Sequence, residues 1–337
     1  MRRLRLTTAG ESHGPGLTAI LSGMPAGLAV DLDLLASDMR RRMHGYGRGG
    51  RMQIESDAVE IRGGLRAGTT LGSPIALWIE NRDHDNWRGV MDPLEIDAGQ
   101  AERRRLRSPR PGHADLSGSL KYLPRDPRDI LERASARESA ARVAAGSIAK
   151  SLLRVFGVEL RSGVRSLGHV GADSPVPTWE ELSRVDETSP LRAVDAALEP
   201  EMVALVDEAK AAGETLGGSA TVIAHGVPAG LGSHVHWDEK LDGALARALM
   251  SVPAVKAVSI GEALEVTRGP GSGAHDAIEL DGDGRWSRPT NRAGGLEGGV
   301  TNGEDVVATI FKKPISTLPR GLPSVDLDTL EPHRAQY

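Results

Sequence analysis

The sequence predicts an α+β fold in layers, with two internally related halves. Three observations support this prediction. β-rich runs follow one another with helical patterns between them, which is typical of α+β layers and not of a doubly wound parallel sheet. A segment near the N-terminus recurs about 200 residues later. Between the two copies lies a long helical pattern that is apolar over most of its surface.

The repeat is a β-rich run that ends at a turn containing glycine and proline. Residues 16–28 read GLTAILSGMPAGL, and residues 218–231 read GSATVIAHGVPAGL. In each copy an acidic residue then opens a helical pattern, over 31–43 and over 238–250. Two copies at this spacing indicate a duplicated half and not a solenoid array.

The chain is expected to form a single domain over residues 1–337. Its related halves would span about 1–160 and 215–337. The segment 172–201 contains four prolines and is the best candidate for a peripheral insertion. We expect its charges to be solvated and assign no chemistry to it.

The remaining elements follow from periodicity and helix-end signals. The longest helix is expected over 136–156, because Ser135 and Glu138 match a capping box and Gly157 provides a stop. Small residues dominate one half of this helix, which favours close packing against strands. The expected strands lie near 16–22, 57–62, 74–80, 218–225, 256–260, 276–280 and 304–311.

Composition excludes several kinds of site. The chain has no cysteine, so a disulfide framework, thiolate metal ligands and a catalytic thiol are all excluded. No stretch approaches 18 consecutive apolar residues and the first residues lack an apolar signal core, so we expect a soluble, cytoplasmic protein without membrane contact. The net charge of −5 argues against a general nucleic-acid binder.

Positive charge is nevertheless concentrated in two arginine clusters. Five arginines fall within twelve residues and five more within eight. An acidic protein with such clusters is expected to bind a small, multiply charged anion at a focused site. The clusters are Arg40, Arg41, Arg42, Arg48 and Arg51, then Arg103, Arg104, Arg105, Arg107 and Arg110.

Two histidines are candidates for proton transfer. His13 follows Ser12 in the loop GESHG at 10–14, where flanking glycines let a ligand approach the imidazole. His113 lies in RPGHAD at 110–115, directly after the second arginine cluster. Histidine is suited to general acid catalysis because its ordinary pKa is near neutrality. A surface or structural histidine is the alternative at both positions.

Two segments are candidates for anion binding. In the run from Gly45 to Arg51, glycines would let backbone amides and rigid guanidinium groups converge on phosphate or carboxylate. A solvated charge run and an RNA-binding arginine-glycine segment are the alternatives there. Arg133 and Arg137 lie beside a predicted helix N-terminus, which already favours an anion. The alternative is a solvated first turn.

Two further patterns are assigned no dinucleotide or metal site. The glycine-rich run 294–303 precedes a strand, the reverse of the order in a dinucleotide-binding fingerprint. His234 and His236 have the alternating spacing that would place two imidazoles on one face of a strand. No third ligand is evident nearby, so we predict no metal.

Taken together, these segments resemble the chorismate synthase family over nearly the whole chain. Six motifs that look like family signatures occur in family order, and their agreement over roughly 300 residues makes the resemblance specific. They are GESHG at 10–14, YGRGGRM at 46–52, RPGHAD at 110–115, the helix start at 133–143, NRAGGLEGG at 291–299 and KPISTL at 313–318.

The resemblance implies a fold, a reaction and a cofactor. Each subunit of a homotetramer would be a layered α/β sandwich with antiparallel sheets and a buried helical core. The reaction would be the 1,4-anti elimination of phosphate from 5-enolpyruvylshikimate 3-phosphate, giving chorismate in the shikimate pathway of aromatic amino acid biosynthesis. Reduced flavin mononucleotide (FMNH2) would lend electron density transiently, with NADPH as an indirect reductant.

The resemblance also implies roles for individual residues. His13 would protonate the departing phosphate, and His113 would protonate or stabilise the reduced flavin. Substrate anions would be held by Ser12, Arg42, Arg48, Arg51, Arg110 and Arg137. Flavin would be contacted by Arg133, Ala134, Ser135, Pro253, Ala254, Gly298, Lys313, Pro314, Ile315, Ser316 and Thr317.

One departure from the family pattern concerns the C-terminal end. Family members continue beyond the segment that matches 322–326 into an Arg-Ser-Asp segment, whose residues have no counterpart here. We expect that this sequence is truncated before that segment. The alternatives are a non-catalytic flavin- or anion-binding protein of the same fold, a flavin-dependent NADPH oxidoreductase and an RNA-binding protein.

Overall fold

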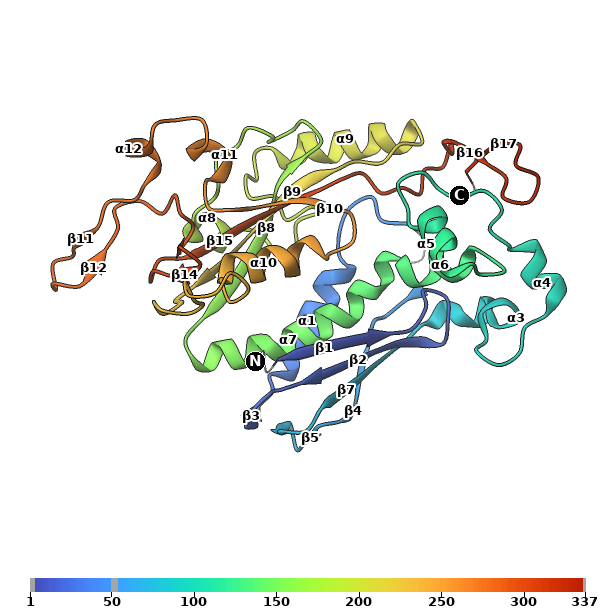
Figure 1. Cartoon of the computed structure of the whole chain (residues 1–337), viewed down its shortest axis with the longest axis horizontal. Helices are drawn as coiled ribbons and strands as arrows, with labels where there is room; N and C mark the ends of the chain where they lie inside the picture. Colours follow the sequence, from blue (N-terminus) through green and yellow to red (C-terminus); the bar gives the residue numbers. More distant parts are fainter. Residues whose placement is uncertain (1–3, 50–53, 336–337) are drawn as a thin grey trace. The chain divides into compact units, whose positions relative to one another are not determined.

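The computed structural model describes residues 4–49 and 54–335, and the chain divides into two compact units (Figure 1). Unit 1 comprises 1–152, 210–215 and 316–337, and unit 2 comprises 153–209 and 216–315. Within the described residues, no helix is both long enough and apolar enough to cross a membrane. The expectation of a single domain stays a prediction.

Unit 1 contains a four-stranded antiparallel sheet with the strand order β1-β2-β7-β4. Its strands are β1 (Arg5–Ala9), β2 (Gly16–Ser22), β4 (Val59–Gly63) and β7 (Ile75–Glu80). A smaller sheet pairs β3 (Ala26–Ala29), β6 (Thr69–Leu71) and β5 (Leu65–Arg66). The alternating burial of β2 and β7 follows from the two-residue period of a strand, which sends every second side chain to the core face.

Two helices, α1 (Leu32–Met43) and α7 (Ser139–Val155), pack against this sheet (Figure 1). The Asp31 side chain caps α1 by accepting from the Leu34 amide at 2.8 Å. Helix α7 contributes mainly alanines to the core, so its backbone lies close to the strands. Gly157, with φ of +74°, ends the helical segment in a conformation that favours glycine. The shared core contains Leu17, Leu21, Leu77, Ile79, Met39, Ala140, Ala144 and Ile148.

A series of short helices lies between β7 and α7 in the chain. Gly118 on α5 lies directly against Ile130 on α6, where a larger side chain would collide, so these two helices pack closely. The elements are η1 (Arg82–Asn86), α3 (Arg88–Met91), α4 (Ala98–Arg103), α5 (Asp115–Tyr122), α6 (Arg128–Ala134) and η2 (Ala136–Glu138).

A C-terminal hairpin supports the second arginine cluster. It pairs β16 (Pro323–Val325) with β17 (Pro332–Arg334). The Ser324 hydroxyl donates to the Pro109 carbonyl at 2.6 Å, and Arg105 pairs with Asp328 at 2.8 Å. These contacts fix the loop that precedes His113.

Unit 2 contains a second four-stranded antiparallel sheet with the order β10-β15-β9-β8. Its elements are β8 (Glu159–Leu167), α8 (Trp179–Ser183), α9 (Glu199–Ala211), β9 (Gly218–His225), α10 (Leu241–Met250), β10 (Val255–Ile260), α11 (Ala263–Val266), α12 (Gly271–Ala274), β11 (Glu279–Leu280), β12 (Trp286–Ser287), β13 (Leu296–Glu297), β14 (Val300–Thr301) and β15 (Val306–Lys312).

Both faces of this second sheet are covered. Val306 packs with residues of α10 on one face, whereas Val307 packs with Leu182 of α8 on the other. The segment 172–201, expected to be peripheral, thus also supplies apolar residues to the core of unit 2, and Leu182 is among the most deeply buried. The alternation along β15 is again the two-residue period of a strand.

The two large sheets have the same strand order relative to the chain. In each, the second strand lies beside the first, the fourth strand is next, and the third occupies the far edge. A helix follows the second strand in both, α1 in unit 1 and α10 in unit 2. This shared plan supports the duplication expected from the repeat, which stays a prediction.

The mixed helix and antiparallel sheet content confirms the predicted fold class. Two local expectations need correction. Residues 136–138 form a 3-10 turn before α7, and Glu138 accepts from Thr8 and Arg142, so the predicted capping box is wrong. His234 and His236 lie in a bend and not on a strand, so the geometry suggested for a metal pair does not exist.

Candidate functional site

The loop that carries His13 connects β1 to β2 and is fixed by a buried asparagine. The side-chain amide of Asn81 donates to the carbonyls of Glu11, at 3.0 Å, and Gly14, at 2.8 Å. The Asn81 side-chain oxygen accepts from Arg137 at 2.9 Å. Asn81 directly follows β7, so the end of a core strand sets the conformation of the histidine loop.

The His13 side chain is held on two sides. Its Nδ1 lies 2.9 and 3.0 Å from the two carboxylate oxygens of Glu132 on α6. The indole of Trp87 stacks on the imidazole, with ring centroids 4.1 Å apart. The Nε2 atom lies 3.8 Å from Asp83, and the side chain retains 18% exposure. The imidazole is therefore fixed in orientation and still accessible.

Glu132 is a buried carboxylate, 1% exposed, that faces both His13 and Arg128. Burial alone raises the pKa of Glu132. The hydrogen bonds and charge of His13, together with the charge of Arg128, outweigh burial and hold the pKa below its ordinary value. Glu132 is therefore ionised at neutral pH and acts only as a hydrogen-bond acceptor.

Two of the predicted substrate-binding arginines converge on one buried carboxylate. Arg42 at the end of α1 and Arg137 before α7 both pair with Asp57, and Arg137 also lies 3.4 Å from Glu55. Burial lowers the pKa of Arg42 more than Asp57 raises it, and the charges of Arg137 and Arg48 lower it further. The sequence predicted only that both arginines bind substrate anions. The fold places both at the Asp57 carboxylate.

Other predicted substrate-binding residues differ in their surroundings. Ser12 is buried, and its amide donates to the Glu132 carbonyl at 3.0 Å. Arg48 lies on an exposed turn after α1. Arg51 lies outside the described residues.

A second cluster surrounds His113 at the start of α5. Nδ1 of His113 contacts the buried Asp115 carboxylate and lies 3.0 Å from Arg110. Arg110 pairs with Asp115 at 2.9 Å and donates to the Thr317 hydroxyl at 2.7 Å. Arg110 and His113, two of the predicted site residues, thus meet at the Asp115 carboxylate, and Thr317, a third, joins them through Arg110.

Asp115 should contribute to stability in a pH-dependent way. Burial raises the pKa of Asp115, but hydrogen bonds from His113 and Arg110 outweigh it and lower the pKa from 3.8 to about 2. A lowered pKa stabilises the fold above the unfolded value, and this contribution is lost as the pH falls through the folded value. Asp115→Asn is therefore expected to cost roughly 2 kcal/mol in the free energy of unfolding at pH 7.

Urea denaturation of the wild type and Asp115→Asn at pH 7, 4 and 2 would measure this contribution. The difference between the two proteins should shrink as the pH falls from about 4 and should be small at about 2. A difference that stays constant across this range would contradict an ionised Asp115 in the folded state.

The predicted flavin-contacting residues are divided between the two units. Residues 133–135, Ser316 and Thr317 belong to unit 1, and Pro253, Ala254, Gly298 and 313–315 belong to unit 2. In unit 1 the Arg133 guanidinium donates to the carbonyls of Gly10 and Thr8. In unit 2 the Lys313 amide donates to the Ala254 carbonyl at 2.9 Å, so two of these segments meet.

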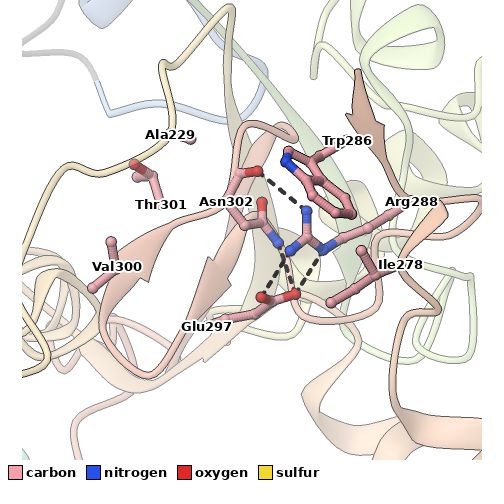
Figure 2. A pocket seen from close by; sticks show the side chains of 8 residues that line it. All are labelled: Ala229, Ile278, Trp286, Arg288, Glu297, Val300, Thr301 and Asn302. Carbon is pink, nitrogen blue, oxygen red and sulfur yellow. Dashed lines mark hydrogen bonds and ion pairs between the residues drawn. The ribbon is translucent and has the colours of Figure 1, made fainter. Parts of the chain in front are cut away.

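A cavity of about 470 Å³ lies in unit 2 (Figure 2). Arg288 and Glu297, which line the cavity, form a bidentate ion pair with N–O distances of 2.7 and 2.9 Å. Trp286 and Ile278 also line it. None of the predicted site residues lines this cavity. Among residues 4–49 and 54–335, no group of three or more His, Asp or Glu side chains is arranged to hold a metal ion.

Sequence reasoning missed the acidic partners and the packing of the two clusters. Glu132, Asp57 and Glu55 belong to no pattern that a single sequence shows, because their partners lie tens of residues away. Asn81 had one usable signal: it is a polar residue directly after an apolar strand. Asp115 was part of a quoted motif, and its contact with His113 is local in sequence.

Comparisons with known proteins show the family of this chain. The family model described as chorismate synthase matches residues 4–337. A chorismate synthase of Moorella thermoacetica is 54% identical over 333 residues, covering 98% of this chain and 85% of that protein. The chorismate synthase of Brevibacillus brevis is 48% identical over 332 residues, covering 98% of this chain and 86% of that protein.

A solved structure is also similar. A crystal structure of chorismate synthase superposes with a TM-score of 0.77 and 41% sequence identity, covering 93% of this chain and 86% of that one. The family model spans nearly all of the sequence, and the curated relatives exceed the identity at which family membership is established. The chain therefore belongs to the chorismate synthase family.

Proposed function

We propose that this chain converts 5-enolpyruvylshikimate 3-phosphate to chorismate with reduced FMN as cofactor and His13 as the acid. Family membership makes the protein a lyase of the shikimate pathway that eliminates phosphate from this small-molecule substrate. The observation that carries the assignment of His13 is its geometry: a fixed imidazole, partly exposed, in the loop that Asn81 holds.

The chemistry of the reaction explains why an acid is needed. Phosphate is a poor leaving group unless its charge is neutralised by a proton or by cations as the C–O bond breaks. With Nδ1 facing Glu132, Nε2 is the atom of His13 that would deliver the proton to the phosphate oxygen. The proton is thereby placed on the group that acquires negative charge.

The arginines would bind the anionic groups of the substrate. Arg42 uses Nε for Ser139 and Nη1 for Asp57, so among the described contacts its Nη2 remains for an anion. Arg137 lies beside it on Asp57, and we assign both to the substrate's phosphate or carboxylates. Ser12, Arg48, Arg51 and Arg110 complete the proposed set.

The residues around His113 fit a flavin cofactor. Arg110, His113 and the Thr317 hydroxyl offer hydrogen-bond donors together, as a reduced flavin requires. Bound reduced FMN would supply electron density to the substrate and recover it, with no net redox change. His113 would hold or give a proton beside it, while Arg133, Ala134, Ser135, Pro253, Ala254, Gly298 and 313–317 would bind it.

Further expectations accompany this proposal. We assign NADPH a role only as an indirect reductant of the flavin, and we propose a homotetramer located in the cytoplasm. The alternative of a non-catalytic flavin- or anion-binding protein has no support from the family or its relatives.

Anaerobic turnover tests the proposed cofactor. The protein is mixed with 5-enolpyruvylshikimate 3-phosphate and photoreduced FMN, and chorismate and phosphate are measured. We expect equal amounts of both products, no turnover with oxidised FMN and none with NADPH alone. Turnover that proceeds equally well with oxidised FMN would rule out the reduced cofactor. Chorismate that forms without phosphate release would rule out the elimination.

A further inference from the structure

We infer that Glu132 is the positioning residue of the proton donor, holding the His13 imidazole so that Nε2 faces the departing phosphate. This inference rests on the proposed role of His13. Glu132 contacts His13 and not the space in front of Nε2, so it acts through the histidine.

The Glu132 carboxylate forms hydrogen bonds with both the backbone and the side chain of His13. One carboxylate oxygen accepts from the His13 amide at 2.8 Å, and both oxygens lie within 3.0 Å of Nδ1. The Glu132 carbonyl also accepts from the amide of Ser12 at 3.0 Å. A single residue of α6 thus fixes two consecutive residues of the histidine loop.

The carboxylate also fixes which nitrogen carries the permanent proton. An ionised carboxylate only accepts hydrogen bonds, so Nδ1 must be the protonated nitrogen facing it. Nε2 is then the nitrogen that gains and loses the reacting proton. This is the same division of labour as in a carboxylate–histidine pair of a hydrolase triad, where the carboxylate sets the tautomer and the ring orientation.

Glu132 is itself held in place. Arg128, one helical turn earlier on α6, donates to its Oε1 at 3.2 Å. The Trp87 ring covers one face of the imidazole, and the guanidinium of Arg104 lies 4.1 Å from the indole centroid. Rotation of the imidazole away from Glu132 would break the hydrogen bonds to Nδ1 and disturb the stacking.

A double-mutant cycle tests the inference by measuring kcat and KM of the full chain under anaerobic conditions. The proteins are the wild type, His13→Ala, Glu132→Ala and the double variant. We expect Glu132→Ala to lower kcat by roughly 10- to 100-fold with little change in KM, the range typical for loss of a residue that orients a reacting histidine. In the His13→Ala background the same change should have almost no effect on kcat.

The outcomes separate this inference from the proposed function. An equal loss in both backgrounds would show that Glu132 acts through general structure, and the inference would fail. If Glu132→Ala keeps the wild-type kcat while His13→Ala is slow, the inference about Glu132 fails and the acid role of His13 stands. A His13→Ala variant with the wild-type rate would overturn both.

Two further variants keep the test decisive if Glu132→Ala misfolds: a conservative change at Glu132 and a control at another carboxylate. Glu132→Gln keeps the shape but offers one acceptor oxygen where the carboxylate offers two, so an intermediate loss of kcat is expected, again absent when His13 is alanine. If Glu132→Ala does not fold, this pair decides the question by the same criterion. Asp38→Asn removes a carboxylate that is 11% exposed and pairs with Lys150 at 2.9 Å, outside the proposed site, and should leave kcat unchanged.

Discussion

His13→Ala is expected to lower kcat by about 10²- to 10⁴-fold, the usual contribution of a general acid. The physical reason is that the departing phosphate would lose its proton donor while its arginine ligands remain. KM should change less than kcat, because protonation stabilises the transition state and not the bound substrate. Anaerobic phosphate release with photoreduced FMN measures the effect.

The matched control for this variant is His236→Ala. His236 is an exposed histidine in a bend of unit 2, and none of the proposed roles involves it. Its replacement should leave kcat and KM at wild-type values. If His13→Ala and His236→Ala both retain the wild-type rate, another group must supply the proton. Thermal unfolding of both variants checks that the fold is intact.

Arg137→Ala is expected to have the largest effect on stability, lowering the free energy of unfolding by about 3–5 kcal/mol. Arg137 is buried and contacts Asp57, Glu55 and the side-chain oxygen of Asn81. Its removal leaves buried carboxylates with less positive charge to compensate them. It also disconnects Asn81 from η2. Urea denaturation at pH 7 measures the loss.

Two comparisons identify the cause of that loss. Arg142→Ala removes an arginine that is 34% exposed and paired with Glu138, four residues earlier in the chain, so it should cost at most about 1 kcal/mol. Adding Asp57→Asn to Arg137→Ala should recover part of the lost stability, because one uncompensated carboxylate is neutralised. A loss below about 1 kcal/mol for Arg137→Ala would contradict the buried ion-pair explanation.

The same substitution is expected to weaken substrate binding, and the effects on stability and on binding can be measured separately. At low temperature and without urea, a folded fraction of Arg137→Ala can be tested for turnover at increasing substrate concentration. A raised KM is the signature of a lost anion contact. A normal KM in the folded fraction would leave Arg137 as a structural residue only.

The sequence by itself determined the fold class, the main strands and the chemical type of the site. Strand β2 was predicted at 16–22 and β9 at 218–225, and both have these bounds. They were readable because each is a β-rich run bounded by a glycine-containing turn. The structure shows the alternating burial expected of such strands. Helix α7 was readable from its length, since an apolar segment of this extent is longer than a typical strand and favours a helix.

The sequence also indicated the residues of the candidate site whose signal is local. His13 lies between glycines, and His113 and Asp115 are two positions apart in one motif, so their proximity needs no tertiary information. The resemblance to one family ordered these motifs along the chain. The start of α7 was less well predicted, because a 3-10 turn and a contact between Glu138 and Thr8 replace the expected capping box.

Only the tertiary structure decided which charges meet. Glu132 lies 119 residues from His13 in the chain, Asp57 lies 80 from Arg137, and Thr317 lies 207 from Arg110. No periodicity or local spacing encodes such pairs, because hydrogen bonds and ion pairs depend on where the packing of strands and helices brings each backbone segment. The sequence named the groups that could do the chemistry, and the tertiary packing brought Glu132 of α6 to His13 and Arg137 of η2 to Asp57.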